Sequence, residues 1–337
     1  MILYDFDYER PRTLKEAAHL LGRCGPAARV MAGGTDLLPN MRVAIARPAT
    51  IIGLGGIAPE PPRSEPDGAI RIDALTRLAT LTESKLIREK LPMLAESALA
   101  VGSNQIREMG TLGGNLCQDT RCLQLNQKHD FQFIEPCFKR GGARCYPFPQ
   151  NKPDVCWSIY MSDIAPALIA LGAELETVDE SGGRRLAVED LFTGSGLHPV
   201  TLKEGEIIHA IVAPPQSPGF GWGYHKCARR GGLEFALAVA AVAICLAADR
   251  ESCTDARIVI GAVRERPVRA AAAERALVGS AIDPARLAAV AAIAAEEAKP
   301  LPHHGFTKSF IVDNLRVHLR RALARAVERA CKAQQTE

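Results

Sequence analysis

Hydrophobic and polar residues alternate along the first 60 positions in the rhythm of short helices and strands. Residues 14–21 repeat apolar side chains at helical spacing directly after Thr13, a residue type that favours the N-cap. Residues 28–32 and 50–54 are short apolar runs flanked by glycine and proline, a pattern that favours buried strands. The pattern therefore predicts an α/β arrangement at the start of the chain.

The pattern changes twice in the middle of the chain. A proline-rich loop at 58–68 precedes a strand at 69–72 and a helical tract that runs to about residue 99. From residue 119 to 153 the periodicity is weak throughout. An unpatterned stretch of this length in a compact domain is usually functional, and bound metal can supply the order that a hydrophobic core does not.

Apolar character returns after Asp163 with the run IAPALIALGAELE. The segment 214–223 is rich in proline and glycine, which predicts a junction with a domain boundary at residue 215. Beyond it the pattern predicts strands at residues 237–246 and 256–263. Alanine-rich helices are predicted to follow at residues 269–277, 283–298 and 309–332.

The longest apolar stretch, residues 235–248, has 14 residues. A helix that crosses a bilayer needs roughly 18 to 20. We therefore interpret this stretch as a buried strand or core helix and expect no membrane span.

Composition narrows the class of protein. The chain has 337 residues, 47% hydrophobic and 23% charged, which predicts two or three globular units. Its 41 basic and 38 acidic residues form no basic stripe, so nucleic acid is not an expected partner. The N-terminal sequence MILYDFDYERPR lacks the pattern of a signal peptide, and we expect a cytoplasmic protein in which ten cysteines serve cores, redox chemistry or metals.

Two glycine clusters have the composition of a phosphate-binding site. The first is Ala32-Gly33-Gly34-Thr35-Asp36 and the second is Thr111-Leu112-Gly113-Gly114-Asn115. Paired glycines allow backbone N–H groups to approach a pyrophosphate, and threonine adds a hydroxyl donor. We expect both clusters to offer backbone donors. Taken locally, each cluster also fits a tight turn without a ligand.

A third glycine run, residues 53–58 (GLGGIA), matches the dinucleotide fingerprint G-x-G-x-x-G/A in form only. That fingerprint must open a helix, but Pro61, Pro62 and Pro66 prevent a helix from continuing here. We reject a Rossmann NAD site.

Half of the cysteines lie within 40 residues. Cys122, Cys137 and Cys145 fall in the unpatterned stretch and Cys156 lies just after it, whereas Cys117 directly follows the second glycine cluster. Four thiolates are the usual ligands of a [4Fe–4S] cluster, and Gly141, Gly142 and Pro147 would let the loop wrap. No C-x₂-C pair is present, so the spacing alone leaves a loop of free or buried thiols open.

The order of four segments resembles the flavin subunits of molybdenum hydroxylases of the xanthine dehydrogenase family. These segments are AGGTD near residue 33, QIREMGTLGGN near 110, SDIAPAL near 165 and HKCARR near 226. The resemblance covers nearly the whole chain. It implies an α+β fold, with a two-part FAD-binding module of the vanillyl-alcohol-oxidase (PCMH) type at 1–215 and a C-terminal α+β domain of the CO dehydrogenase flavoprotein type at 216–337.

The resemblance assigns cofactor contacts residue by residue. It implies that the FAD pyrophosphate is held by Ala32, Gly33, Gly34, Thr35, Asp36, Thr111, Gly113, Gly114 and Asn115. Gln118 lies close enough to the second cluster to join it. Asp163 is expected at the ribityl or ribose part and Lys226 near the flavin ring, where a cation raises the flavin potential. Without the resemblance, we would interpret Asp163 as a helix cap and Lys226 as a solvated surface charge.

An insertion distinguishes this chain from an ordinary flavin subunit, because 47 residues separate Asn115 from Asp163. In this respect it is similar to the β subunits of 4-hydroxybenzoyl-CoA reductases. That similarity implies a [4Fe–4S] cluster at about 119–158, ligated by Cys122, Cys137, Cys145 and Cys156. It also implies a molybdopterin-binding large subunit, a small subunit with two [2Fe–2S] clusters, ferredoxin as electron donor, and removal of the phenolic hydroxyl of the substrate.

Two other functions remain open at the level of the sequence. One is an ordinary hydroxylase flavin subunit that sends electrons outward to NAD or a quinone. The other is a metal-stabilised scaffold without flavin. We predict no catalytic residue in this chain, because no Ser/His/Asp or Cys/His arrangement with a recognisable motif is present.

Overall fold

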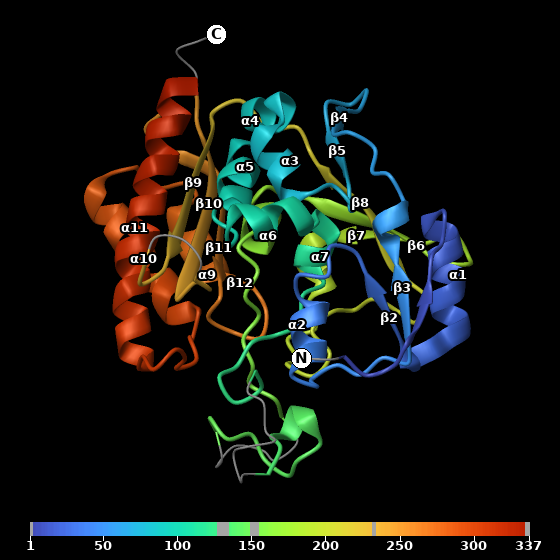
Figure 1. The fold of residues 1–337 in the computed structure, drawn as a ribbon. Coiled ribbons are helices and arrows are strands. Elements are labelled where there is room, and N and C mark those ends of the chain that lie inside the picture. Colours follow the sequence, from blue (N-terminus) through green and yellow to red (C-terminus); the bar gives the residue numbers. More distant parts are fainter. Residues whose placement is uncertain (1–2, 127–134, 149–154, 231–233, 334–337) are drawn as a thin grey trace.

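The computed structural model describes residues 3–126, 135–148, 155–230 and 234–333. It contains three sheets placed side by side, with helices between and around them (Figure 1). The insertion projects from the lower end of the body in that view. The architecture is α+β, as predicted.

The N-terminal sheet is parallel, with the strand order β1-β3-β2. Its elements are β1 (Asp7–Glu9), α1 (Leu14–Cys24), β2 (Ala28–Met31) and β3 (Thr50–Gly53). The Thr13 side chain accepts a hydrogen bond from the Glu16 N–H, so it caps α1 as predicted. Beyond β3 there is only the single 3₁₀ turn Leu54–Gly56, which confirms that the third glycine run opens no Rossmann helix.

The central sheet is antiparallel, with the order β4-β5-β8-β6-β7. Its strands are β4 (Arg63–Ser64), β5 (Ile70–Asp73), β6 (Glu174–Val178), β7 (Arg185–Ala187) and β8 (Ile207–Ala213). The helices around it are α3 (Leu78–Glu83), α4 (Lys85–Lys90), α5 (Pro92–Leu99), α6 (Asn104–Met109), α7 (Leu112–Leu116) and α8 (Ala165–Ala170). The predicted helical tract is broken because Ser84 caps α4 and Pro92 opens α5.

The C-terminal sheet is antiparallel, with the order β12-β11-β10-β9. Its elements are β9 (Phe220–Cys227), β10 (Ala238–Leu246), β11 (Cys253–Gly261), β12 (Val268–Arg269), α9 (Ala271–Leu277), α10 (Pro284–Glu297) and α11 (Lys308–Ala333). Val239 and Ala241 pack toward the central sheet, whereas Ala240 and Val242 pack toward the C-terminal helices. Both faces of β10 are buried, which explains its uninterrupted apolar sequence.

The strand β9 begins inside the segment that we interpreted as a junction. Its glycines permit close packing, because a Cβ atom on Gly223 would lie 1.9 Å from the Ala322 carbonyl oxygen of α11. A Cβ on Gly221 would lie 2.0 Å from the Ala326 carbonyl oxygen. The absence of side chains at Gly221 and Gly223 therefore allows α11 to pack directly against β9. The domain boundary at residue 215 stays a prediction.

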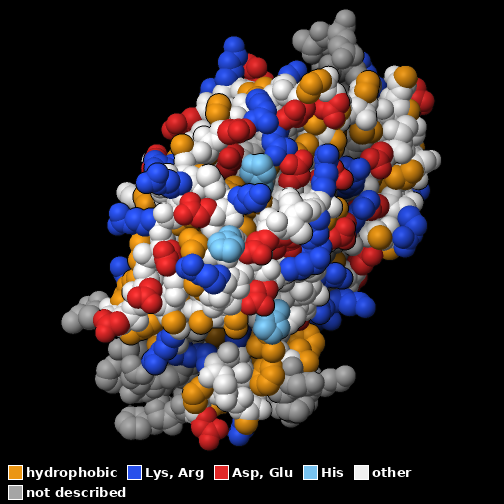
Figure 2. Space-filling model, turned by 90° about the vertical axis from the view of Figure 1, so that its right-hand side faces the viewer, with side chains coloured by type: hydrophobic (Ala, Val, Ile, Leu, Met, Phe, Trp, Pro, Cys, Tyr) orange, Lys and Arg blue, Asp and Glu red, His pale blue; other side chains and the backbone are white. Residues whose placement is uncertain are grey.

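The surface in Figure 2 carries Lys/Arg and Asp/Glu side chains interspersed. Within the described residues, no helix has both the length and the apolar content needed to cross a membrane.

Candidate functional site

Two loops built from the predicted glycine clusters lie against each other. Loop 1 (residues 32–36) joins β2 to α2 (Leu37–Arg42), and loop 2 (residues 111–115) opens α7. A Cβ atom on Gly33 would lie 1.8 Å from the Met109 carbonyl oxygen, so the approach of the two segments requires glycine. Gly34 has a φ of 69°, a conformation that glycine adopts without strain.

Loop 1 supplies backbone donors. The N–H groups of residues 33–36 donate to no acceptor among the described residues. Loop 2 differs from our expectation. The Gly113 N–H donates to the Ala74 carbonyl at 2.8 Å, and the Gly114 N–H donates to Thr111 Oγ1 at 3.1 Å. Thr111 caps α7 and thereby occupies the Gly114 amide, so that only the Thr111 N–H of loop 2 has no acceptor among the described residues.

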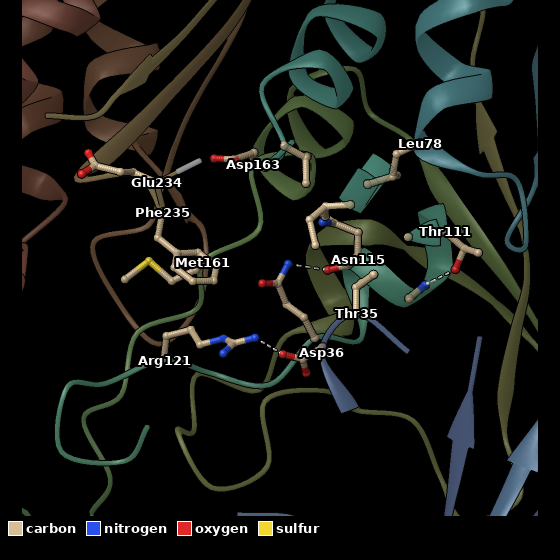
Figure 3. A pocket seen from close by; sticks show the side chains of 16 residues that line it. Thr35, Asp36, Leu78, Thr111, Asn115, Arg121, Met161, Asp163, Glu234 and Phe235 are labelled. Carbon is tan, nitrogen blue, oxygen red and sulfur yellow. Dashed lines mark hydrogen bonds and ion pairs between the residues drawn. The ribbon is translucent and has the colours of Figure 1, made fainter. Parts of the chain in front are cut away.

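Three cavities lie along these loops. The first cavity, of about 350 Å³, is lined by residues of both loops and by Asp163 and Phe235 (Figure 3). The second, of about 510 Å³, contains loop 1 and shares Thr35, Thr111 and Gly114 with the first. The third has a volume of about 580 Å³. Gly114 lines all three, so its missing side chain leaves the passage between them open.

The structure brings together eleven of the twelve predicted cofactor residues. The first cavity is lined by Thr35, Asp36, Thr111, Gly114, Asn115, Gln118 and Asp163. The second adds Gly33 and Gly34, Ala32 lines the second and the third, and Gly113 lines the third. Lys226 lines none of the three. Cys117 is exposed and lines the second and third cavities.

The Asp36 carboxylate braces loop 1. It forms an ion pair with Arg121 and accepts a hydrogen bond from the Asp119 N–H at 3.0 Å. Burial raises the pKa of Asp36, and the Arg121 guanidinium opposes this effect. Both oxygens already have protein partners. Asp36 therefore holds the loop in place and is not a free acceptor for a ligand.

Asp163 and Lys226 form a buried ion pair at the other end of the first cavity. Lys226 Nζ lies 2.7 Å from Asp163 Oδ2 and also donates to the Ala100 carbonyl at 2.8 Å. Asp163 Oδ1 is buried and has no partner among the described residues. Burial raises the pKa of Asp163 to about 6, and Lys226 opposes this rise. Lys226 thus lies behind Asp163 and positions it, whereas Oδ1 remains available to a ligand hydroxyl.

This ion pair predicts a pH-dependent loss of stability in Lys226→Met. The raised pKa of Asp163 means that folding stability falls as the pH rises from about 4 to about 6. Removing Lys226 raises that pKa further and leaves a buried unpaired carboxylate at higher pH. We expect the free energy of unfolding of the FAD-free chain to fall by about 3 kcal/mol near pH 8, and by less near pH 5.

Urea unfolding at both pH values measures this effect, with Lys226→Arg as the control that keeps the charge. Equal losses of stability at both pH values in Lys226→Met would contradict the role of Asp163. The arginine variant should lose less than the methionine variant near pH 8.

Sequence reasoning missed several residues of the first cavity. Leu78, Val101 and Ile106 form an apolar part of the wall, and Arg121, Met161 and Phe235 stand together at one side in Figure 3. The apolar residues just before the second glycine cluster were a usable signal. Phe235 had no such signal, because the chain places it there through the turn between β9 and β10.

The site fits a long cofactor with a diphosphate and a flat ring. Loop 1 offers four free amides to phosphate oxygens. The apolar wall suits a planar ring, and Asp163 Oδ1 suits the hydroxyls of a polyol chain. FAD contains these three parts together with an adenosine.

The comparisons with known proteins agree with this chemistry. Residues 4–216 match the family described as the FAD binding domain in molybdopterin dehydrogenase, and residues 222–326 match the CO dehydrogenase flavoprotein C-terminal domain. The chain therefore belongs to the FAD-binding subunits of the molybdenum hydroxylase family. It is an oxidoreductase subunit, and FAD is its cofactor.

Relatives match over most of the chain. The medium chain of carbon monoxide dehydrogenase from Afipia carboxidovorans is 29% identical over 98% of this chain and 99% of its own length. The FAD-binding subunit of an aldehyde oxidoreductase from Escherichia coli is 31% identical over 81% and 86%. A chain in the crystal structure of cyanide-inactivated Cu,Mo-CO dehydrogenase has a TM-score of 0.79 at 29% identity, covering 98% of this chain and 100% of that one.

Proposed function

We propose that this chain moves electrons between its FAD and partner subunits of a complex. The partners are a molybdopterin-binding large subunit and a small subunit with [2Fe–2S] clusters. The names of the relatives support this assignment, because they describe medium chains and FAD-binding subunits of dehydrogenases. The sequence has no recognisable Ser/His/Asp or Cys/His motif, so we assign the substrate reaction to another subunit.

The proposal extends to a [4Fe–4S] cluster held by Cys122, Cys137, Cys145 and Cys156. The observation that carries it is the mutual proximity of these thiols. Burial raises the pKa of Cys122, and the Cys145 and Cys137 thiols raise it further. Burial likewise raises the pKa of Cys145, to which the Cys156 and Cys137 thiols add. All four are free cysteines.

The polar groups around the thiols suit metal-bound thiolates. The backbone N–H groups of Leu125 and Gln124 hydrogen bond to the Cys122 thiol and lower its pKa against the effect of burial. Those of Trp157 and Phe148 do the same for Cys145. Hydrogen bonds of this kind to cluster sulfurs tune the potential of iron–sulfur centres. Iron would supply the charge that makes the buried thiolates stable.

The spacing of the described side chains does not support a site for a single metal ion. Within the described residues, no group of three or more His, Cys, Asp or Glu side chains converges closely enough to hold a metal ion. The thiolates of a zinc site must all lie about 2.3 Å from one atom. A four-iron cluster takes one thiolate on each iron and therefore needs a wider arrangement. Residues 127–134 and 149–154 of the insertion lie outside the described residues.

Local glycine geometry also favours a loop that wraps around a centre. Gly141 has a φ of 89°, and a Cβ on Gly142 would lie 1.6 Å from the Pro136 carbonyl oxygen. The Gly142 N–H donates to the Cys137 carbonyl at 3.0 Å, closing a tight turn after this cysteine. The turn points the chain from Cys137 back toward Cys145.

Two directions of electron flow are candidates. The relatives named as dehydrogenases of carbon monoxide, caffeine and glyceraldehyde favour oxidation of a substrate and outward flow to an acceptor. The cysteine insertion favours the second candidate, a reductase of the 4-hydroxybenzoyl-CoA type in which ferredoxin delivers electrons through the added cluster. In both cases the flavin couples one-electron centres to a two-electron reaction.

Cofactor analysis of the purified complex tests the proposal. Two [2Fe–2S] clusters and one [4Fe–4S] cluster give about eight iron atoms per FAD, whereas an ordinary complex gives about four. Molybdenum should be present with the FAD, and the chain expressed alone should turn over no substrate. Turnover by the single chain would refute the assignment to a complex. Reduction of 4-hydroxybenzoyl-CoA by reduced ferredoxin would decide for the second candidate.

A further inference from the structure

A separate cavity, which we call the side cavity, adjoins the first cavity. Its volume is about 600 Å³, and it shares Arg121, Met161 and Phe235 with the first cavity. Figure 3 shows these three side chains together on one side of the first cavity. The remaining walls come from the start and end of the insertion and from the turn around His304. The side cavity therefore lies between the flavin site and the cysteine insertion.

The walls of the side cavity are aromatic. The rings of Phe148 and Trp157 lie 5.7 Å apart between centroids, and Phe306 lines the same space. Phe235 remains 45% exposed, with the Arg121 guanidinium 5.0 Å from its ring centroid. Flat apolar walls of this kind suit a planar ring.

Three polar atoms in the lining have no partner. Arg121 Nε, Trp157 Nε1 and His304 Nε2 are buried and form no hydrogen bond with any described residue. The first two can only donate. A buried donor without an acceptor costs about 1–3 kcal/mol, so their convergence on one cavity indicates a ligand that carries acceptor oxygens.

The backbone at His304 supports a functional role. Its φ of 52° lies in the left-handed region, which costs energy for a residue other than glycine. Strain of this kind gathers at binding sites, where the surrounding structure imposes it. His304 lines the side cavity, and its Nε2 atom is buried.

The charge of the side cavity selects among ligands with acceptor oxygens. The positive charge of Arg121 is compensated by its ion pair with Asp36. Burial lowers the pKa of His304, and Arg229 lowers it further, so the imidazole is neutral near pH 7. A site with little net charge favours carbonyl oxygens over a carboxylate or phosphate.

We propose that the side cavity binds the head group of a quinone. The ring packs against the aromatic walls of the side cavity, and its carbonyl oxygens accept hydrogen bonds from Arg121 and Trp157. This inference deepens the proposed function, on which it rests, because it names the class of carrier that takes electrons outward. In the overall exchange two electrons and two protons convert the quinone to its hydroquinone, while reduced flavin returns to the oxidised form.

Calorimetric titration of the purified, FAD-loaded complex with menadione tests this site. The variant Trp157→Phe removes the Nε1 donor and keeps an aromatic ring. The matched control is Trp222→Phe, the only other tryptophan of the chain, which lies 3.4 Å from the Arg329 guanidinium, away from the side cavity. We expect menadione to bind and Trp157→Phe to weaken its affinity about tenfold, with no change in the control.

A second variant, His304→Asn, should weaken binding similarly, because asparagine tolerates the left-handed backbone but does not reach as far. The quinone site is wrong if menadione does not bind, if both tryptophan variants lose affinity equally, or if NAD⁺ binds in its place. FAD and iron contents are measured on the same samples. If menadione binding fails while the FAD and iron contents are unchanged, only the quinone site is wrong. The proposed function is then unaffected.

Discussion

Replacing Gly114 by valine is expected to yield a folded protein without flavin. A Cβ atom at this position would meet Thr111 Oγ1 at 2.8 Å and the Ala32 side chain at 3.8 Å, and otherwise faces the cavities. Valine methyl groups would therefore occupy space that borders all three cavities, where we expect the cofactor to bind. Overpacking of about 3 kcal/mol corresponds to a loss of FAD affinity of more than about a hundredfold.

Gly56→Val provides the matched control. A Cβ on Gly56 meets nothing within 4 Å, and this glycine belongs to the run that we rejected as a dinucleotide site. The ratio of flavin to protein absorbance measures occupancy, and circular dichroism reports folding. A folded Gly114→Val protein with full FAD content would show that the cofactor does not pass between loops 1 and 2.

Replacing Cys137 by serine is expected to remove about four iron atoms per chain while FAD stays bound. Cys137 is buried beside Cys122 and Cys145, so its loss breaks the ligand set at its centre. If an external ferredoxin delivers electrons through the cluster, its reduction of FAD should also stop. Chemical reductants should still reduce the flavin.

Cys331→Ser is the control for this variant, because Cys331 lies on α11 among the C-terminal helices. Iron analysis and FAD absorbance of both variants decide the result. Full iron content in Cys137→Ser, and also in Cys145→Ser, would eliminate the cluster. It would also remove the main reason for the reductase candidate.

The elements predicted best were those with local causes. Thr13 caps α1, as predicted from its position before the first apolar repeat. The uninterrupted apolar run at 237–246 forms β10, whose two faces are both buried. Loop 1 was also recognisable. Gly33 is required by the close approach of the Met109 carbonyl, and Gly34 adopts a positive φ. In each case a few neighbouring residues determine the conformation.

The details that escaped prediction depend on contacts between distant segments. The Gly113 amide of loop 2 is occupied because the Ala74 carbonyl lies opposite it, which the sequence around residue 113 does not reveal. The ion pair of Lys226 with Asp163, 63 positions away in the sequence, was likewise not predicted, and the place of Lys226 near the flavin ring stays a prediction. Arg121 gains its two roles from Asp36 and Phe235, residues far away in the sequence.

The two ends of the insertion meet side by side. The Arg121 N–H donates to the Ile159 carbonyl at 2.7 Å, the Ile159 N–H donates back at 2.9 Å, and the hydroxyls of Thr120 and Ser158 are hydrogen bonded. A segment that leaves and re-enters a fold at adjacent points can be exchanged for a short turn without displacing its frame. The insertion can thus be removed or replaced by a short turn, and the two paired ends would still hold the surrounding flavoprotein frame together.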